Sequence, residues 1–237
     1  MICGVTSLLH ITEEPGCTVI VLDDGKANAL SSTMLAAVDA ALDAAVDRGR
    51  PVVLAGRAGL LSGGFDLTVM QGDDHDARMD MVFAGFELAY RLVALPLPVV
   101  IGCTGHAIAM GVFLLCTGDR RVGAAGDFRI GATETALGIV MPQFAIELVR
   151  GRLTPAATDR ALITGDTFGP DAAAAMGFLD EVVPAGEVLA RAVDTADRFA
   201  AYDLGVYAET KRRVRTPWLG ALRAAIDADA AQRRSGG

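Results

Sequence analysis

The sequence has few of the features that mark disulfide-bonded, membrane-spanning or nucleotide-binding proteins. Its four cysteines stand singly without a Cys-x-x-Cys pair, and Cys103 and Cys116 lie in apolar segments. They are therefore interpreted as small core residues in a reducing compartment, not as disulfides or zinc ligands. No apolar run approaches the ~18 residues of a membrane helix, and no basic segment followed by a long apolar run begins the chain. These absences predict a cytoplasmic protein that does not contact membranes.

Two further classes of site are not indicated. Neither Gly-x-Gly-x-x-Gly nor the phosphate-loop pattern ending in Gly-Lys-Ser/Thr occurs, so the glycine clusters do not predict a nucleotide loop. The histidines His10, His75 and His106 lack the spacing of metal ligands, and we expect no metal. His106 is interpreted as a structural histidine.

Positive charge is scarce and concentrated near the C-terminus. The net charge is −8, which argues against nucleic acid as a partner. From residue 204 to residue 237, however, seven basic residues oppose three acidic ones. The cluster of Lys211, Arg212 and Arg213 can bind an anionic ligand, or it can pair with acidic groups of the same or a neighbouring subunit.

Patterns typical of strands and helices alternate through residue 140, and the chain beyond is almost wholly helical. The expected strands are 7–12, 17–22, 51–55, 99–103, 120–124, 128–130 and 179–183. The expected helices are 31–48, 77–95, 111–117, 143–150, 155–163, 170–176, 187–201, 205–214 and 218–232. This order predicts an α/β body, residues 1–200, and a helical C-terminal appendage, residues 201–237, that packs on it without a flexible linker.

One ionisable side chain, Glu134, stands in the segment IGATETALGIVMP, from Ile130 to Pro142. Burial among Ile130, Leu137 and Ile139 predicts a raised pKa and a better base. The alternative is a surface glutamate that caps a loop, because glutamate is mostly exposed. Two glycine-bearing segments upstream, LLSGGFDL at 60–67 and TGHAIAMGVFLLCTGD at 104–119, favour the functional interpretation, although each alone is typical of a turn or a strand-to-helix junction.

Together the three segments resemble the active-site signatures of the crotonase, or enoyl-CoA hydratase/isomerase, family. The resemblance runs from the Asn28-Ala29-Leu30 triplet to the segment FLDEVVP at 178–184. It implies a crotonase-like spiral of ββα units, with C-terminal helices that pack over a neighbour in homotrimers, often paired into hexamers. It also implies an acyl-CoA thioester as substrate, so that coenzyme A enters as part of the substrate and no separate cofactor is expected.

The family holds the enolate oxygen of its intermediate with two backbone N–H groups, and the resemblance carries these to Phe65 and Met110. Each such donor is typically worth ~3 kcal/mol of transition-state stabilisation. Met110 has a separate rationale, because free N–H groups and the dipole at the start of the helix expected from Gly111 favour an anion.

The resemblance places coenzyme A against the loop that bears Asn28-Ala29-Leu30 and against the oxyanion loop, which carries the Phe65 N–H. The residues expected there are Lys26, Ala27, Ala29, Ser62, Gly64, Asp66 and Leu67. Asp66 is expected to fix its loop by hydrogen bonds. A basic residue of the cluster at 211–213 can in addition reach the phosphates bound by a neighbouring subunit.

Enoyl-CoA hydratases use two glutamates, one for the water and one for the proton. The alignment puts Phe113 at the first position and Glu134 at the second, and IGATETALGIVMP resembles the corresponding segment of Δ3,Δ2-enoyl-CoA isomerases. A single carboxylate is what a 1,3-proton shift requires. The leading hypothesis is therefore isomerisation, with Glu134, Phe65 and Met110 as catalytic residues.

Two alternatives remain open. The first is an enoyl-CoA hydratase that uses Glu134 with water held by backbone groups or by another acid, for which Glu87 is the reserve candidate. The second is a non-catalytic acyl-CoA-binding protein whose pocket is narrowed by Phe65 and Phe113.

Overall fold

The computed structural model of the chain describes residues 2–6 and 8–235, which form two β-sheets with helices around them. The large sheet has the order β1 (Ile2–Thr6), β2 (Leu9–Glu13), β3 (Thr18–Leu22), β4 (Val52–Gly56), β6 (Val99–Cys103), β8 (Arg120–Ala125) and β10 (Glu181–Pro184). The small sheet has the order β5 (Gly59–Ser62), β7 (Gly105–Ile108) and β9 (Ile130–Gly131).

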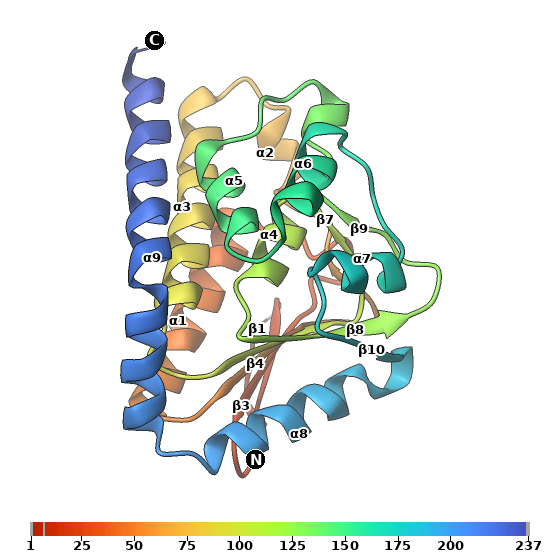
Figure 1. Ribbon diagram of the computed structural model, residues 1–237, viewed down its shortest axis with the longest axis vertical. Coiled ribbons are helices and arrows are strands. Elements are labelled where there is room, and N and C mark those ends of the chain that lie inside the picture. The colour runs from red at the N-terminus through yellow and green to blue at the C-terminus, as the bar shows by residue number, and fades with distance from the viewer. Residues whose placement is uncertain (1, 7, 236–237) are drawn as a thin grey trace.

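Helices cover both sheets (Figure 1). They are α1 (Ser32–Arg48), α2 (Leu67–Met70), α3 (His75–Ala94), α4 (Met110–Cys116), α5 (Gln143–Arg150), α6 (Pro155–Ile163), α7 (Pro170–Met176), α8 (Val188–Ala200) and α9 (Leu204–Ser235). Two 3-10 turns, η1 (Thr135–Leu137) and η2 (Ala185–Glu187), join some of them.

The chain repeats one unit along the sheets. In each repeat one strand enters the large sheet, the next enters the small sheet, and a helix follows, as in β4–β5–α3, β6–β7–α4 and β8–β9–α5. Strands β4 and β6 are buried along their whole length, which is why they appear in the sequence as continuous apolar runs without alternation. The expected spiral of ββα units is confirmed.

The structure contains three strands that the sequence patterns did not predict. Strands β5 and β7 were not expected, because their short glycine-bearing sequences have the composition of loops. Strand β1, paired antiparallel with β2, was also not expected, and Ser7 of the expected strand 7–12 lies outside the described residues.

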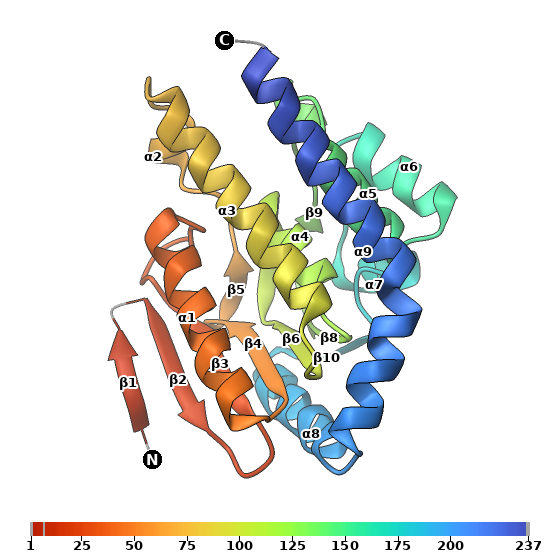
Figure 2. The ribbon, with the colours of Figure 1, turned by 90° about the vertical axis from the view of Figure 1, so that its left-hand side faces the viewer.

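The two helices expected at 205–214 and 218–232 are one continuous helix, α9, with Pro217 inside it. A proline in a helix interior removes a hydrogen bond and costs ~3 kcal/mol. Tertiary contacts oppose that cost, because Leu222, Ala225 and Ile226 are buried and the Trp218 indole N–H donates to the Glu147 carbonyl. Helix α9 lies along α3 and α5 of its own chain (Figure 2).

Candidate active site

The carboxyl ends of the three parallel strands of the small sheet bring the predicted catalytic segments together. Strand β5 pairs with β7 and β7 with β9, in the registers Ser62↔Ala107 and Ala107↔Ile130. Because parallel strands end at the same edge of a sheet, the residues that follow them emerge side by side. Phe65, Met110 and Glu134 each stand a few residues beyond one of these strand ends.

The loops that carry the Phe65 and Met110 amides touch at Gly64. A Cβ atom on Gly64 would lie 3.0 Å from the Ala109 Cβ and 3.5 Å from the Met110 nitrogen, and the φ of Gly64 is +102°. Only glycine adopts this conformation without strain and leaves the loops this close. Neither the Phe65 nor the Met110 N–H donates a hydrogen bond to an acceptor among the described residues. Two free backbone donors therefore stand next to each other.

Ala109 holds an unusual backbone conformation immediately before helix α4. Its φ is 51° and its ψ is −125°, a region that residues with a Cβ rarely occupy. Such strain typically costs 1–3 kcal/mol and is concentrated at functional sites. At this position it turns the chain so that Met110 becomes the first residue of α4, with its N–H at the positive end of the helix.

Glu134 lies between β9 and the turn η1. Its Oε2 atom is buried and has no hydrogen-bond partner among the described residues. Burial raises the pKa of the carboxyl group, and hydrogen bonds from the backbone N–H groups of Glu134 and Thr133 oppose that rise. The predicted direction of the pKa shift is confirmed.

The environment expected for Glu134 is only partly correct. Ile130 is buried, but Leu137 is 69% exposed and Ile139 is 45% exposed. The reason is Gly138, whose left-handed conformation ends η1 and turns the chain outward. The glutamate is therefore half-buried with a buried Oε2 atom, whereas Leu137 and Ile139 after it are exposed.

The two loops predicted to contact coenzyme A lie side by side. The Gly63 N–H donates to the Ala27 carbonyl at 2.9 Å, and the Leu30 N–H donates to the Gly64 carbonyl at 2.8 Å. Lys26, Ala27 and Leu67 are exposed, Ala29 and Asp66 are half-buried, and Ser62 and Gly64 are buried.

Side chains in these loops form hydrogen bonds with backbone groups. The Ser62 hydroxyl donates to the Asn28 carbonyl at 2.7 Å and accepts from the Gly64 N–H at 3.1 Å. The Asn28 amide donates to the carbonyls of Leu22 and Leu61. Asp66 accepts from the Thr68 N–H at 2.8 Å, so it caps α2 and fixes its loop as expected. Ser62 therefore has a positioning role in the structure.

Arg57, which the sequence interpretation missed, lies beside Lys26. Its guanidinium donates to the Lys26 carbonyl and comes within 3.9 Å of Asp23. The signal in the sequence was weak, because a single arginine after a buried strand is common. The structure adds a second cation to the edge of the predicted coenzyme A site.

Neither position considered for a second acid supplies one to the site. The carboxylate of Glu87 is exposed on α3 and accepts two hydrogen bonds from Arg223 of α9, which lower its pKa, so the reserve second acid is ruled out. Phe113, which the motif resemblance aligns with the first hydratase acid, is 2% exposed and belongs to the core.

The basic cluster at 211–213 is divided in the structure. The Lys211 ammonium is buried and pairs with Asp119 at 2.7 Å, so it is not available to the phosphates of a neighbour. Burial lowers its pKa to about 8, against the attraction of Asp119. Arg212 and Arg213 are exposed, and both pair with Glu209. The alternative that these cations neutralise acids of the same subunit is therefore correct for this chain.

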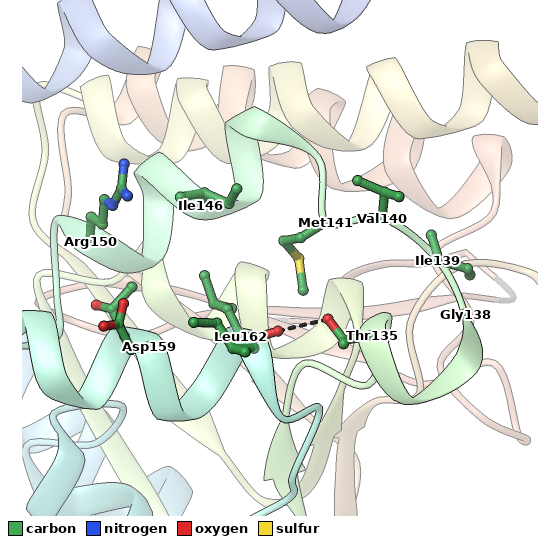
Figure 3. Close-up of a pocket in the computed structure, with 11 residues that line it drawn as sticks. Thr135, Gly138, Ile139, Val140, Met141, Ile146, Arg150, Asp159 and Leu162 are labelled. Carbon is green, nitrogen blue, oxygen red and sulfur yellow. Dashed lines mark hydrogen bonds between the residues drawn. The ribbon is translucent and has the colours of Figure 1, made fainter.

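Apolar hollows flank the segment after Glu134. One, of about 500 Å³, lies between this segment, α5 and α6, and there Thr135 donates to the Leu162 carbonyl while Arg150 and Asp159 stand at the other end (Figure 3). A second, of about 470 Å³, lies between α3, the start of α5 and α9. Its apolar lining consists mainly of Met79, Val82, Phe83, Phe86, Val140 and Met141.

Neither a metal-binding cluster nor a membrane-spanning helix is found in the part of the chain that the structure describes. Within residues 2–6 and 8–235, no group of three or more His, Cys, Asp or Glu side chains is arranged to hold a metal ion. Over the same residues, no helix is long and apolar enough to cross a membrane.

Known proteins with similar sequences include both isomerases and hydratases. The chain is 30% identical to human mitochondrial enoyl-CoA delta isomerase 1 over 184 residues, which are 75% of this chain and 59% of the human protein. It is 31% identical to a putative enoyl-CoA hydratase of Thermus thermophilus, over 77% of this chain and 73% of that protein.

Solved structures agree in fold. A Mycobacterium tuberculosis protein, named an enoyl-CoA isomerase in one structure and a probable enoyl-CoA hydratase in another, matches with a TM-score of 0.90 and 42% identity, over 95% of this chain and 98% of that chain. Human mitochondrial Δ3-Δ2-enoyl-CoA isomerase matches with a TM-score of 0.89 and 28% identity, over 94% and 89% of the two chains.

The fold and the site define a spiral α/β protein of the crotonase class. A model of the enoyl-CoA hydratase/isomerase family matches residues 12–235. The chain belongs to this family, as its motifs predicted.

Proposed function

We propose that the protein is an acyl-CoA enzyme of fatty-acid metabolism that isomerises Δ3-enoyl-CoA to Δ2-enoyl-CoA. Two observations together carry the proposal. Glu134 is a half-buried carboxylate whose buried Oε2 atom has no hydrogen-bond partner among the described residues, and a core phenylalanine, Phe113, stands where the motif aligns with the first acid of hydratases. A proton shift within one molecule needs one base that takes a proton and returns it, whereas hydration also needs a group that activates water.

In the proposed reaction the Glu134 carboxylate removes a proton from C2 of the 3-enoyl thioester. The electron pair of the broken C–H bond moves into the carbonyl group, and the resulting dienolate oxygen accepts hydrogen bonds from the Phe65 and Met110 N–H groups. The protonated glutamate then returns the same proton to C4, which leaves the double bond between C2 and C3. Reactant and product have the same composition, so no second substrate is required.

The test compares isomerisation of 3-hexenoyl-CoA with hydration of crotonyl-CoA. We expect efficient isomerisation, weak hydration, and a loss of isomerase activity of about 10²–10⁴-fold in Glu134→Gln. Asp73→Asn, at an exposed site, is the control and should keep full activity. Efficient hydration that survives Phe113→Leu but not Glu134→Gln would overturn the assignment.

Enoyl-CoA hydratase is the second candidate, and the hydratase names among relatives and structural neighbours support it. A non-catalytic acyl-CoA-binding protein would instead bind acyl-CoA tightly by calorimetry and turn over none of a series of chain lengths and double-bond positions. The same pair of assays, extended over that series, separates the three functions.

Coenzyme A is proposed to lie along the paired loops at 26–30 and 62–67. The exposed ammonium of Lys26 supplies one positive charge there, and the neighbouring guanidinium of Arg57, which donates to the Lys26 carbonyl, supplies a second. We expect Lys26→Gln to raise the KM for acyl-CoA about tenfold, the effect of losing one charge-assisted hydrogen bond. The KM for the corresponding acyl-pantetheine, which lacks the adenosine phosphates, should not change. Equal increases in KM for both substrates would mean that Lys26 does not contact the adenosine phosphates.

The assembly is proposed to be a homotrimer or a hexamer, as the resemblance to the family implies. Exposed apolar side chains, among them Leu137, Val140 and Ile163, are consistent with further burial on assembly. Light scattering coupled to size exclusion should give three or six times the 24.6 kDa chain mass. A monomer at micromolar concentration would contradict this expectation.

The cytoplasmic location stays a prediction from the sequence.

A further inference from the structure

Helix α5 begins without a cap of its own. The residue before it, Pro142, has no side chain that accepts a hydrogen bond, yet the first N–H groups of a helix need acceptors. Asp229 of α9 supplies them from far along the chain. Its Oδ1 accepts from the Gln143 N–H at 3.1 Å, and its Oδ2 accepts from the Phe144 N–H at 2.9 Å. Both carboxylate oxygens are thus used at the positive end of the α5 dipole, an arrangement that favours a negative charge.

The segment held in this way is the one that leads from the catalytic glutamate. Between Glu134 and α5 the backbone makes its hydrogen bonds at the start, where the Glu134 carbonyl accepts from the N–H groups of Leu137 at 3.0 Å and Ile139 at 2.9 Å. Thr135 fixes the same end through its bond to the Leu162 carbonyl at 2.7 Å. The other end is fixed where α5 starts.

The middle of the segment, residues 138–140, is exposed. Val140 is 90% exposed, and Val140 and Met141 border both apolar hollows, one facing α6 (Figure 3) and one facing α3 and α9. The segment is therefore a thin wall between two hollows, held at its two ends. Asp229 also lines the hollow between α3, α5 and α9, so it joins the helix and the wall at the same place.

We propose that Asp229 is a positioning residue through which the C-terminal helix holds the Glu134 segment in place. This inference deepens the proposed isomerase function and rests on it for its catalytic consequence. Asp229 makes no contact with the reacting atoms in this proposal. It stabilises the start of α5, and α5 in turn limits how far the wall, and with it Glu134, can move from the Phe65 and Met110 amides.

The test uses Asp229→Asn and Asp229→Ala in the full-length protein. The asparagine keeps one acceptor and nearly the same volume but loses the charge, and the alanine loses both acceptors. The first readout is hydrogen exchange at the Leu137 and Ile139 amides, which bond to the Glu134 carbonyl and not to Asp229. We expect exchange there to be on the order of tenfold faster in the alanine variant and to rise by less in the asparagine variant.

The second readout is isomerisation of 3-hexenoyl-CoA. We expect kcat to fall on the order of tenfold or more in Asp229→Ala, because a small displacement of a catalytic group lowers the rate steeply. Binding of free coenzyme A should stay at the wild-type value, because the predicted coenzyme A loops lie elsewhere.

Two variants on the same helix are the controls. Asp227→Asn removes an exposed acid two residues away and should change neither readout. Arg223→Gln breaks the ion pair of α9 with Glu87 on α3, so it should lower the thermal midpoint without altering kcat or the exchange of the two amides.

The proposal is overturned if Asp229→Ala leaves the exchange of the Leu137 and Ile139 amides unchanged. It is also overturned if Arg223→Gln accelerates that exchange and lowers kcat as much as Asp229→Ala does, because the effect would then come from a general loosening of α9. If the wild-type protein does not isomerise the substrate at all, the proposed function fails while the exchange experiment still decides the role of Asp229.

Discussion

Glu134 makes the folded chain less stable when it is charged. Because its pKa is raised by burial, the folded state favours the protonated form more than the unfolded state does. The stability that protonation supplies is fully present below the ordinary glutamate pKa of about 4.3 and is lost as the pH rises through the higher pKa of the folded state. The same burial that makes the carboxylate a stronger base thus destabilises the fold at neutral pH.

We predict that Glu134→Gln is more stable than the wild type at neutral pH by on the order of 1 kcal/mol, since it removes a buried charge with an unbonded oxygen. The difference should vanish below about pH 4, where both side chains are neutral. Urea unfolding across this pH range measures it, with the exposed Asp73→Asn as a reference. A difference independent of pH would show that charge is not its cause.

At the scale of elements, helix α3 approaches the Phe65 side chain at a glycine, Gly85. A Cβ atom on Gly85 would lie 2.6 Å and 2.7 Å from two carbons of the Phe65 ring, and 3.4 Å from the Met110 Cε. The Phe65 ring therefore occupies the space on α3 that a side chain at position 85 would fill. The narrowing of the pocket expected from Phe65 is limited by this contact.

We predict that the sign of the stability change caused by Gly85→Ala depends on which residue occupies position 65. In a helix interior this change normally stabilises by up to about 1 kcal/mol, but here the added methyl group displaces the ring and should cost about 1–3 kcal/mol. In a Phe65→Ala background it should become stabilising. Urea unfolding of the four proteins in a double-mutant cycle measures the coupling. Equal effects in both backgrounds would mean that the ring does not set the requirement for glycine.

At the scale of the whole molecule, α9 is attached to the body by a buried ion cluster. Asp119 lies after α4, and its carboxylate accepts from Lys211 at 2.7 Å and from Arg215 at 2.6 Å, with all three side chains at most 10% exposed. It also accepts from the Val99 N–H at 2.8 Å, so it connects α9 to the start of β6.

We predict that Asp119→Asn destabilises the protein by about 3–5 kcal/mol, because two buried cations are left without a compensating charge. Arg212→Gln, which breaks an exposed pair on the same helix, should have little effect. Thermal and urea unfolding of the two variants test the difference. If both change stability by similar small amounts, the cluster is not what attaches α9.

Elements with strong local patterns were predictable from the sequence. Helices α1, α3 and α5 begin and end within about two residues of the expected limits, because their apolar spacing, together with the capping residues of α1 and α3, acts locally. Strands β5 and β7 were not, because each is four residues long and becomes a strand only by pairing with a neighbour. The same applies to α9, where packing outweighs the local preference of Pro217 to end a helix.

The family, the order of the three motif segments and the phenylalanine at position 113 could be read from the order of residues, because motifs and spacing are properties of the chain alone. Which charged groups are already paired within the molecule follows from the fold. Lys211 is buried against Asp119, Glu87 pairs with Arg223, and Asp229 caps α5, each with a partner at least 85 residues away. Such pairs form only when the fold brings the partners within hydrogen-bond reach, and for Lys211 and Asp119 the fold also removes both charges from water. Neither condition is visible in the order of residues.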